Sequence, residues 1–193
     1  MNRLQQLEKK VKELYQEKNP NRAKWADWLA DNHVFVVANN ASELAKKYGA
    51  NEELSRTAAL LHDIADTRMK RDDKKHEEVS LQIARELMTE FGYSEPEIEL
   101  VVYDAIRYHS CYGNEHSESL EGKILSTADS LAHLKTDFYV FAAWAIGRTM
   151  TLKKLKEWIL EKIDRDLNNK IFFEEVRKEA LPDYKLIREL FSR

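Results

Sequence analysis

Adjacent histidine and aspartate residues in the first half of the chain carry the clearest chemical signal in this sequence. His62 and Asp63 are followed by Asp66 three residues later. On a helix these side chains share a face with the small residue Ala59, whereas leucines and alanines occupy the opposite side. Burying polar groups without partners costs about 2–7 kcal/mol, so ionisable residues on an inward face need a reason. The pattern favours a metal-binding or catalytic site.

Three more residues of this kind lie on apolar helical faces elsewhere in the chain. His33 falls in an apolar stripe, where an isolated histidine more often has a core or capping role. Asp129 is four residues before His133, so a simple pair between them explains either residue alone. His109 also points inward by its spacing. Taken together, imidazoles and carboxylates from several helices can be satisfied around one divalent ion, and such ligands suit Mn, Mg, Co, Fe, Ni or Zn.

The elements that must position these residues are all predicted to be helices, so the expected fold class is all-α. Only five glycines and three prolines interrupt the chain, and most segments show helical periodicity. The predicted helices cover residues 4–14, 22–48 (bent near His33), 51–66, 76–91, 94–109, 119–134, 138–146, 151–168 and 172–191 (interrupted at Pro182). We expect a single domain over residues 1–193, with a core at about 22–135 and a C-terminal helical extension at 136–193 packed on it.

Composition excludes several classes of protein. The formal net charge is −3, which argues against a partner that is a nucleic-acid polymer. The single cysteine, Cys111, cannot form an internal disulfide, and the charged segment 1–19 does not resemble a signal peptide. The longest apolar run, residues 138–146, is too short for a membrane span. We therefore expect a cytoplasmic protein without a membrane partner, in which this aromatic run packs the C-terminal helices or forms a homodimer interface.

The order of His33, the pair His62-Asp63 and Asp129 resembles the H…HD…D signature of the HD superfamily of metal-dependent phosphohydrolases. The local contexts are also similar, in AALLHDIAD at 58–66 and LSTADSLA at 125–132. The resemblance covers about residues 25–135. It implies an HD-domain helical bundle in which His33, His62, Asp63 and Asp129 hold one divalent metal ion. His133, four residues after Asp129, is expected to support that ligand.

The resemblance leaves a second metal ion open. In binuclear members Asp63 would bridge two ions, and further histidines lie between the HD pair and the last aspartate. His76 and His109 lie in this interval, but their spacing does not clearly match that pattern. One ion per chain is therefore favoured.

The implied activity is hydrolysis of a phosphate ester or anhydride of a small molecule, most simply a nucleotide, by metal-activated water. Several nucleotide-cleaving members carry an acid where this chain has Asp66, so Asp63 and Asp66 are the predicted catalytic residues; a surface ion pair is the alternative for Asp66. The predicted substrate contacts are Arg68, Lys70, His76 and His109. The alternatives are a solvated loop for Arg68 and Lys70, a second metal ion for His76, and a core hydrogen bond for His109.

Two other functions remain as alternatives to a phosphatase or pyrophosphatase. Some HD relatives use paired iron to oxidise substrates with oxygen, which would require two iron ions per chain. A non-catalytic module that binds nucleotides for regulation would keep the pocket without turnover.

Overall fold

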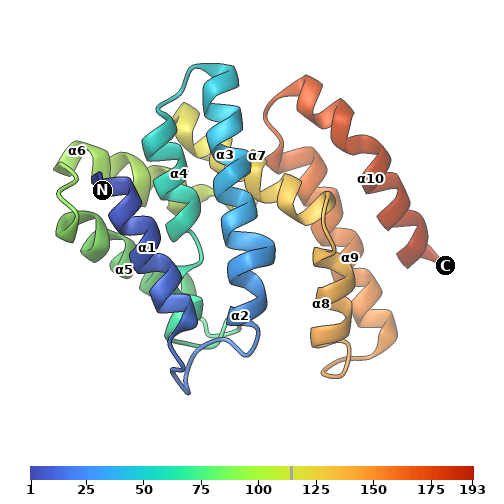
Figure 1. Ribbon diagram of the computed structural model, residues 1–193. Helices are drawn as coiled ribbons and strands as arrows, with labels where there is room; N and C mark the ends of the chain where they lie inside the picture. Colours follow the sequence, from blue (N-terminus) through green and yellow to red (C-terminus); the bar gives the residue numbers. More distant parts are fainter. Residues whose placement is uncertain (114) are drawn as a thin grey trace.

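The computed structural model describes residues 1–113 and 115–193, and all regular secondary structure in these residues is helical (Figure 1). The elements in chain order are α1 (Arg3–Gln16), α2 (Ala26–Leu29), the π-helical turn η1 (Ala30–Val34), α3 (Phe35–Tyr48), α4 (Glu52–Leu61), the 3₁₀ turn η2 (Ile64–Thr67), α5 (His76–Glu90), α6 (Glu95–Ile98), the π-helical segment η3 (Glu99–Ile106), α7 (Leu120–Leu134), α8 (Phe138–Ile146), α9 (Leu152–Arg165), η4 (Asp166–Lys170, π-helical) and α10 (Glu174–Ser192). The all-α prediction is confirmed.

Helices α3, α4 and α7 form the centre of the bundle. Their contact surfaces carry small, fully buried residues, among them Ala41 on α3, Ala58 on α4 and Ala128 on α7. Small side chains let helix axes approach closely, so polar residues beside them are brought within reach of one another. Helices α5 and α6 lie on one side of this centre, and α8, α9 and α10 lie on the other (Figure 1).

The N-terminal helix α1 supports the segment that follows α4. Its first turn is closed by a capping box between Asn2 and Gln5, and Leu7 and Val11 of its apolar stripe are fully buried. At the end of the helix, the Tyr15 hydroxyl donates a hydrogen bond to the Asp63 carbonyl oxygen over 3.0 Å. This contact fixes the backbone of the HD pair from outside its own helix.

Two predicted helices differ from the observed ones around the candidate site. The helix expected to bend near His33 does so through the π-helical turn η1. The helix predicted to continue through Asp66 ends at Leu61, and the chain turns at Asp63 into η2. Tertiary contacts replace the helical hydrogen bonds here, because the Ala65 N–H donates to Ser80 Oγ, at 3.2 Å. Asp66 therefore does not lie on the face of α4.

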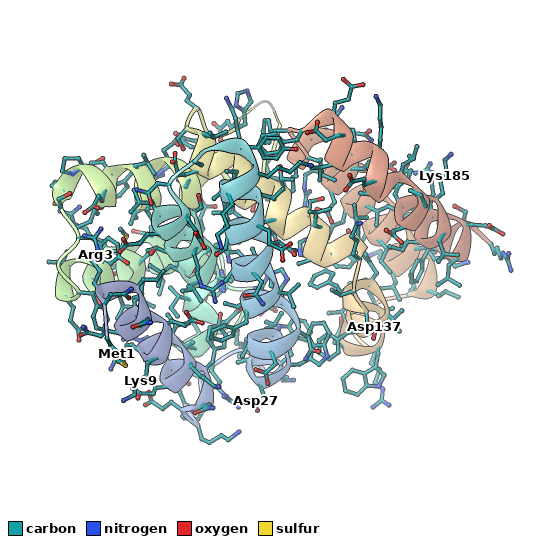
Figure 2. All side chains as sticks on the ribbon, turned by 45° about the horizontal axis from the view of Figure 1, so that its top comes forward. Met1, Arg3, Lys9, Asp27, Asp137 and Lys185 are labelled. Atoms are coloured by element: carbon teal, nitrogen blue, oxygen red, sulfur yellow. The ribbon has the colours of Figure 1, made fainter. Side chains whose placement is uncertain are left out.

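The C-terminal helices lie at the opposite end of the bundle from α1. Figure 2 shows this separation through the labelled side chains of Met1 and Arg3 at one end and Asp137 and Lys185 at the other. The predicted interruption at Pro182 was wrong, because α10 runs through it. Pro182 is exposed, so water can satisfy the carbonyl oxygen that loses its helical partner.

The turn η4 joins the C-terminal helices to α7 through side-chain hydrogen bonds. Ser130 Oγ donates to the Asp166 carbonyl oxygen at 2.7 Å, and Thr127 Oγ1 donates to the Lys170 carbonyl oxygen at 3.2 Å. All four residues are buried. The last quarter of the chain thus reaches the helix that carries Asp129.

Candidate metal centre

Four side chains from three helical segments meet beneath the surface. His33 comes from η1, His62 and Asp63 from the end of α4, and Asp129 from the middle of α7. Each is at most 8% exposed. The π-helical turn at η1 is the kind of irregularity that often occurs at functional sites, since it redirects a side chain without ending the helix.

The donor atoms have the spacing of ligands around one ion. Nε2 of His33 lies 3.2 Å from Nε2 of His62 and 3.3 Å from Oδ1 of Asp129. Oδ2 of Asp63 lies 3.3 Å from Nε2 of His62 and 3.7 Å from Nε2 of His33. Ligands about 2.1 Å from a shared ion, at tetrahedral or octahedral angles, are about 3.0–3.4 Å apart. The residues therefore fit a divalent metal.

Unpaired atoms at the centre point to the same conclusion. Oδ1 of Asp129 is buried without a hydrogen-bond partner among the described residues. Nδ1 of His62 donates to the Ala59 carbonyl oxygen at 2.7 Å, which leaves Nε2 as the ring atom that faces the other ligands. Such a backbone contact sets the tautomer of a metal-binding histidine. Although burial opposes it, the carboxylates of Asp63 and Asp129 raise the pKa of His62 in the metal-free protein, so a metal ion would take the place of a proton on Nε2. Burial lowers the pKa of His33, which favours the neutral ring that a metal requires.

His109 stands at the edge of this group. Its Nδ1 donates to the Ile106 carbonyl oxygen at 2.6 Å, as His62 does to Ala59, so its Nε2 is the accepting atom, and the Ser110 hydroxyl lies 3.3 Å from it. One ligand atom from each of His62, Asp63 and His109 falls within 4.8 Å of the others. Burial, and then the charge of His62, lower the pKa of His109 to about 4. The ring is thus neutral near pH 7 and suited to a ligand or a hydrogen-bond acceptor.

On the solvent side of the centre, Asp63 is paired with an arginine from the loop after η2. The Arg71 Nη2 group donates to Oδ2 of Asp63 and, at 2.5 Å, to Oδ2 of Asp66. Oδ1 of Asp66 lies 2.9 Å from Nε2 of His76. Burial alone would raise the pKa of Asp63, but Arg71 and His62 hold it well below its usual range.

On the interior side, Asp129 is paired with Lys170 from η4. The Lys170 ammonium donates to Oδ2 of Asp129 and lies 3.9 Å from Oδ1 of Asp166. His133 lies between the same two carboxylates, with Nε2 3.3 Å from Asp129 and Nδ1 3.1 Å from Asp166. Burial lowers the pKa of His133 to about 3, so the ring is neutral. The structure places His133 beside Asp129, where the sequence analysis expected it.

The basic residues predicted from the loop are arranged differently from the sequence expectation. Arg68 and Lys70, the nearest in sequence to the HD pair, are exposed. Arg71 turns back to the carboxylates instead, and nothing in the local sequence singles it out from its basic neighbours. Lys170 and Asp166 were also missed, because a Lys four residues after an Asp on a helix looks like an ordinary surface pair.

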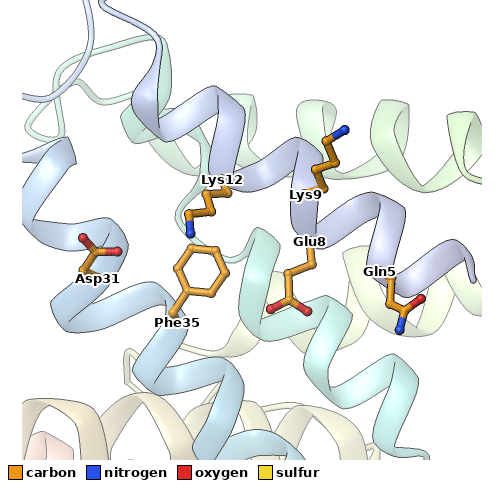
Figure 3. A pocket seen from close by; sticks show the side chains of 6 residues that line it. All are labelled: Gln5, Glu8, Lys9, Lys12, Asp31 and Phe35. Atoms are coloured by element: carbon orange, nitrogen blue, oxygen red, sulfur yellow. The ribbon is translucent and has the colours of Figure 1, made fainter. Parts of the chain in front are cut away.

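A groove between α1 and the η1–α3 segment is separate from the centre. Figure 3 shows its lining, which consists of Gln5, Glu8, Lys9, Lys12, Asp31 and Phe35. None of these residues contributes a ligand atom to the centre, and four of the six are charged. This groove has the character of a solvated surface.

The chain belongs to the HD domain family. The family model matches residues 30–134, which include all four candidate ligands. Among curated proteins, the chain is 32% identical over 157 residues to a ribonuclease Y from Acholeplasma laidlawii, a match that covers 78% of this chain and 26% of that protein. It is 29% identical over 104 residues to an uncharacterized protein from Clostridium beijerinckii, over 53% of this chain and 63% of that one. The chain therefore spans only part of either relative.

Solved structures of similar fold cover nearly the whole chain. A predicted HD superfamily hydrolase from an uncultured Thermotogales bacterium aligns with all of this chain and 91% of its own, at 25% identity and a TM-score of 0.58. YpgQ from Bacillus subtilis aligns over 97% of this chain and 93% of its own, at 20% identity and a TM-score of 0.68. An HD-superfamily hydrolase from Bacillus thuringiensis aligns over 98% of this chain and 93% of its own, at 21% identity and a TM-score of 0.68. Membership of a hydrolase family is consistent with the metal-binding geometry.

The apolar run before the C-terminal helices forms α8. Phe138 and Tyr139 are buried, and Phe141 stacks on Trp28 with ring centroids 3.7 Å apart. Trp144 stays 69% exposed. Within the described residues, no helix is both long enough and apolar enough to span a bilayer.

Proposed function

We propose that this chain is a metal-dependent phosphohydrolase that cleaves a phosphate ester or anhydride of a small molecule, most simply a nucleotide. The observation that carries the proposal is the convergence of His33, His62, Asp63 and Asp129 at ligand spacing in a chain of the HD family. The bound ion would polarise a phosphoryl oxygen and lower the pKa of an attacking water. We propose one ion per chain, because His62 and Asp63, two of the three residues in the group that includes His109, already belong to the four proposed ligands.

The remaining polar residues receive roles by their position. Asp63 is proposed as a ligand and, with Asp66, as a catalytic residue that orients water or accepts its proton. His76 contacts Asp66, and His109 faces His62, so both are proposed to contact substrate at the opening of the centre. Arg68 and Lys70 are exposed on the adjacent loop, where they are proposed to attract the anionic substrate.

The proposal is tested by turnover of purified protein with Mn, Co or Mg. The substrate panel contains nucleoside mono-, di- and triphosphates and, because one relative is a ribonuclease, a short RNA. Separate assays for phosphate and pyrophosphate distinguish a phosphatase from a pyrophosphatase. A variant that combines His62→Ala and Asp63→Ala should lose activity, whereas His116→Ala, at an exposed position, should not. No turnover by the native chain with any metal would count against the proposal.

Two simpler measurements bear on the alternatives. Elemental analysis should give one metal ion per chain, and two iron atoms with a coloured protein would favour the oxygenase alternative. Ligand-dependent stabilisation without turnover would favour a regulatory module. Homodimerisation through the exposed side of α8 stays a prediction, which light scattering of the native chain and of Trp144→Ala would test.

A further inference from the structure

Arg71 is a partly exposed residue in direct contact with the candidate metal centre. Its side chain is 30% exposed, compared with 1% for His33, 3% for Asp129 and 11% for Asp63. It nevertheless contacts two buried carboxylates. A substrate that reaches the ion from this side must therefore meet the Arg71 guanidinium.

The guanidinium and a bound ion would need the same oxygen atom. Oδ2 of Asp63 is the oxygen that faces the imidazoles of His62 and His33, at 3.3 and 3.7 Å. Arg71 Nη2 donates to that same Oδ2. Two cations on one carboxylate oxygen repel each other strongly in a site that is largely shielded from water. Metal binding and the Arg71–Asp63 contact therefore oppose each other.

A second carboxylate keeps Arg71 in place when the first is released. Its Nε lies 3.1 and 3.2 Å from the two carboxylate oxygens of Asp66, and its Nη2 lies 2.5 Å from Oδ2. Asp66 is completely buried and is itself held by His76. Loss of the Asp63 contact would thus leave Arg71 anchored to Asp66 through both Nε and Nη2, and would release one N–H of Nη2 as a donor.

We propose that Arg71 competes with the metal ion for Oδ2 of Asp63 and, once the ion is bound, uses the released N–H of Nη2 together with Nη1 to hold the phosphoryl group of the substrate. A guanidinium matches phosphate oxygens in a bidentate geometry that an ammonium cannot reproduce. The second half of this statement rests on the function proposed above, whereas the first half concerns the metal ion alone. Arg71 would be a substrate-positioning residue whose availability depends on the metal.

The competition is tested by calorimetric titration of Mn²⁺ into metal-free protein without substrate. Arg71→Gln should bind Mn²⁺ about tenfold more tightly than the native chain, a coupling of ordinary size for two ligands that share a site. Arg71→Lys should fall between them, since its single ammonium pairs less well with two carboxylates. The matched control is Lys74→Gln, an exposed cation in the same loop, which should bind as the native chain does. Equal or weaker binding by Arg71→Gln would overturn the competition.

The phosphate contact is tested by titration of inorganic phosphate into the Mn²⁺-loaded proteins. The native chain and Lys74→Gln should bind phosphate about tenfold more tightly than Arg71→Gln. Equal binding by Arg71→Gln, or no binding by the native chain, would overturn this role. Circular dichroism verifies that each variant is folded, and Arg71→Lys carries both tests if Arg71→Gln is not. Failure of the proposed function would look different, as absence of turnover while competition and phosphate binding persist.

Discussion

The two carboxylates of the candidate centre are paired with cations that differ in their burial and in which carboxylate oxygen they contact. Asp129 is paired with Lys170, which is 2% exposed and bonds to Oδ2, the oxygen that does not face the histidines. Asp63 is paired with the more exposed Arg71, which bonds to the oxygen that does face them. The first pair is compatible with a bound ion and the second opposes it. A bound ion would therefore leave the Asp129–Lys170 contact in place, whereas it would replace the Asp63–Arg71 contact.

The difference follows from where each cation lies in the fold. Lys170 is in η4, whose backbone is bonded to α7, and its carboxylate partners Asp129 and Asp166 are both buried. Arg71 is in a loop between η2 and α5 with exposed neighbours. Burial makes removal of one partner from an ion pair costly, whereas partial exposure lets water take its place.

The largest expected effect comes from removing either carboxylate charge. Asp63→Asn and Asp129→Asn should each weaken Mn²⁺ binding by at least about 100-fold, because each removes a proposed ligand. Their stabilities should differ, since Asp129→Asn leaves the buried Lys170 with only the more distant Asp166, at 3.9 Å, whereas Asp63→Asn leaves Arg71 hydrogen-bonded to Asp66. Calorimetry and urea unfolding measure the two properties. Native-like Mn²⁺ affinity in either variant would remove that residue from the ligand set.

Removing the lysine of the interior Asp129–Lys170 pair should lower the free energy of unfolding. Lys170→Met leaves Asp129 with a buried, poorly compensated charge, so we expect the metal-free protein to lose about 3–5 kcal/mol of unfolding free energy. Urea unfolding in EDTA gives this value. The control is Lys178→Met on α10, whose ion pair with Glu174 is exposed and should contribute almost nothing. A similar small loss for both variants would mean that the interior pair gives no more support than a surface pair.

Removing the arginine of the solvent-side Asp63–Arg71 pair should lower the free energy of unfolding by less than Lys170→Met does. Arg71→Gln is expected to lower the unfolding free energy of the metal-free protein by about 1–2 kcal/mol, because water can reach the carboxylates that it leaves. Saturating Mn²⁺ should recover most of this loss, since the ion replaces the missing positive charge. Thermal unfolding with and without Mn²⁺ measures the recovery. If Arg71→Gln proves as costly as Lys170→Met, the contrast between the two sides is wrong.

Acid should weaken both the Asp63–Arg71 and the Asp129–Lys170 pair. Each pair should account for part of the unfolding free energy that is lost at low pH. Burial by itself would raise the pKa of Asp63 and Asp129, but Arg71 and His62 beside the first, and Lys170 beside the second, hold both well below their usual range. Because these folded-state pKa values are depressed, the stabilisation is complete above the unfolded value of about 3.9 and is lost as the pH falls below it.

Burial also lowers the pKa of His109 to about 4 and that of His133 to about 3, so below about pH 6.5 the unfolded chain takes up protons that these folded-state rings do not. We therefore expect the stability of the metal-free protein to fall gradually below about pH 6.5 because of the histidines. Below about pH 4 a further acid loss should follow, which the two carboxylates cause. Urea unfolding in EDTA at successive pH values gives the curve. The acid loss should be shallower in Arg71→Gln and in Lys170→Met than in the native chain. An unchanged slope in both variants would show that other carboxylates dominate acid unfolding.

Much of the helical framework was predictable because helix signals are local. Asn51 and Ser119 accept the expected capping hydrogen bonds at the starts of α4 and α7, and the bend expected near His33 is the π-helical turn η1. The end of α4 was not predictable from periodicity. Its continuation through Asp66 is replaced by contacts from α1 and α5, which lie outside the segment.

For the candidate site, the sequence by itself determined which residues could be ligands: the order of His33, His62-Asp63 and Asp129 resembles the HD pattern, and the family match now agrees with it. The tertiary structure alone decided which cations meet them. It selected Arg71 rather than Arg68 or Lys70 from one loop, and it brought Lys170 to Asp129 from 41 residues away. Periodicity describes the face of a single helix, whereas the oxygen of a carboxylate that meets a given cation depends on how separate helices and loops pack together.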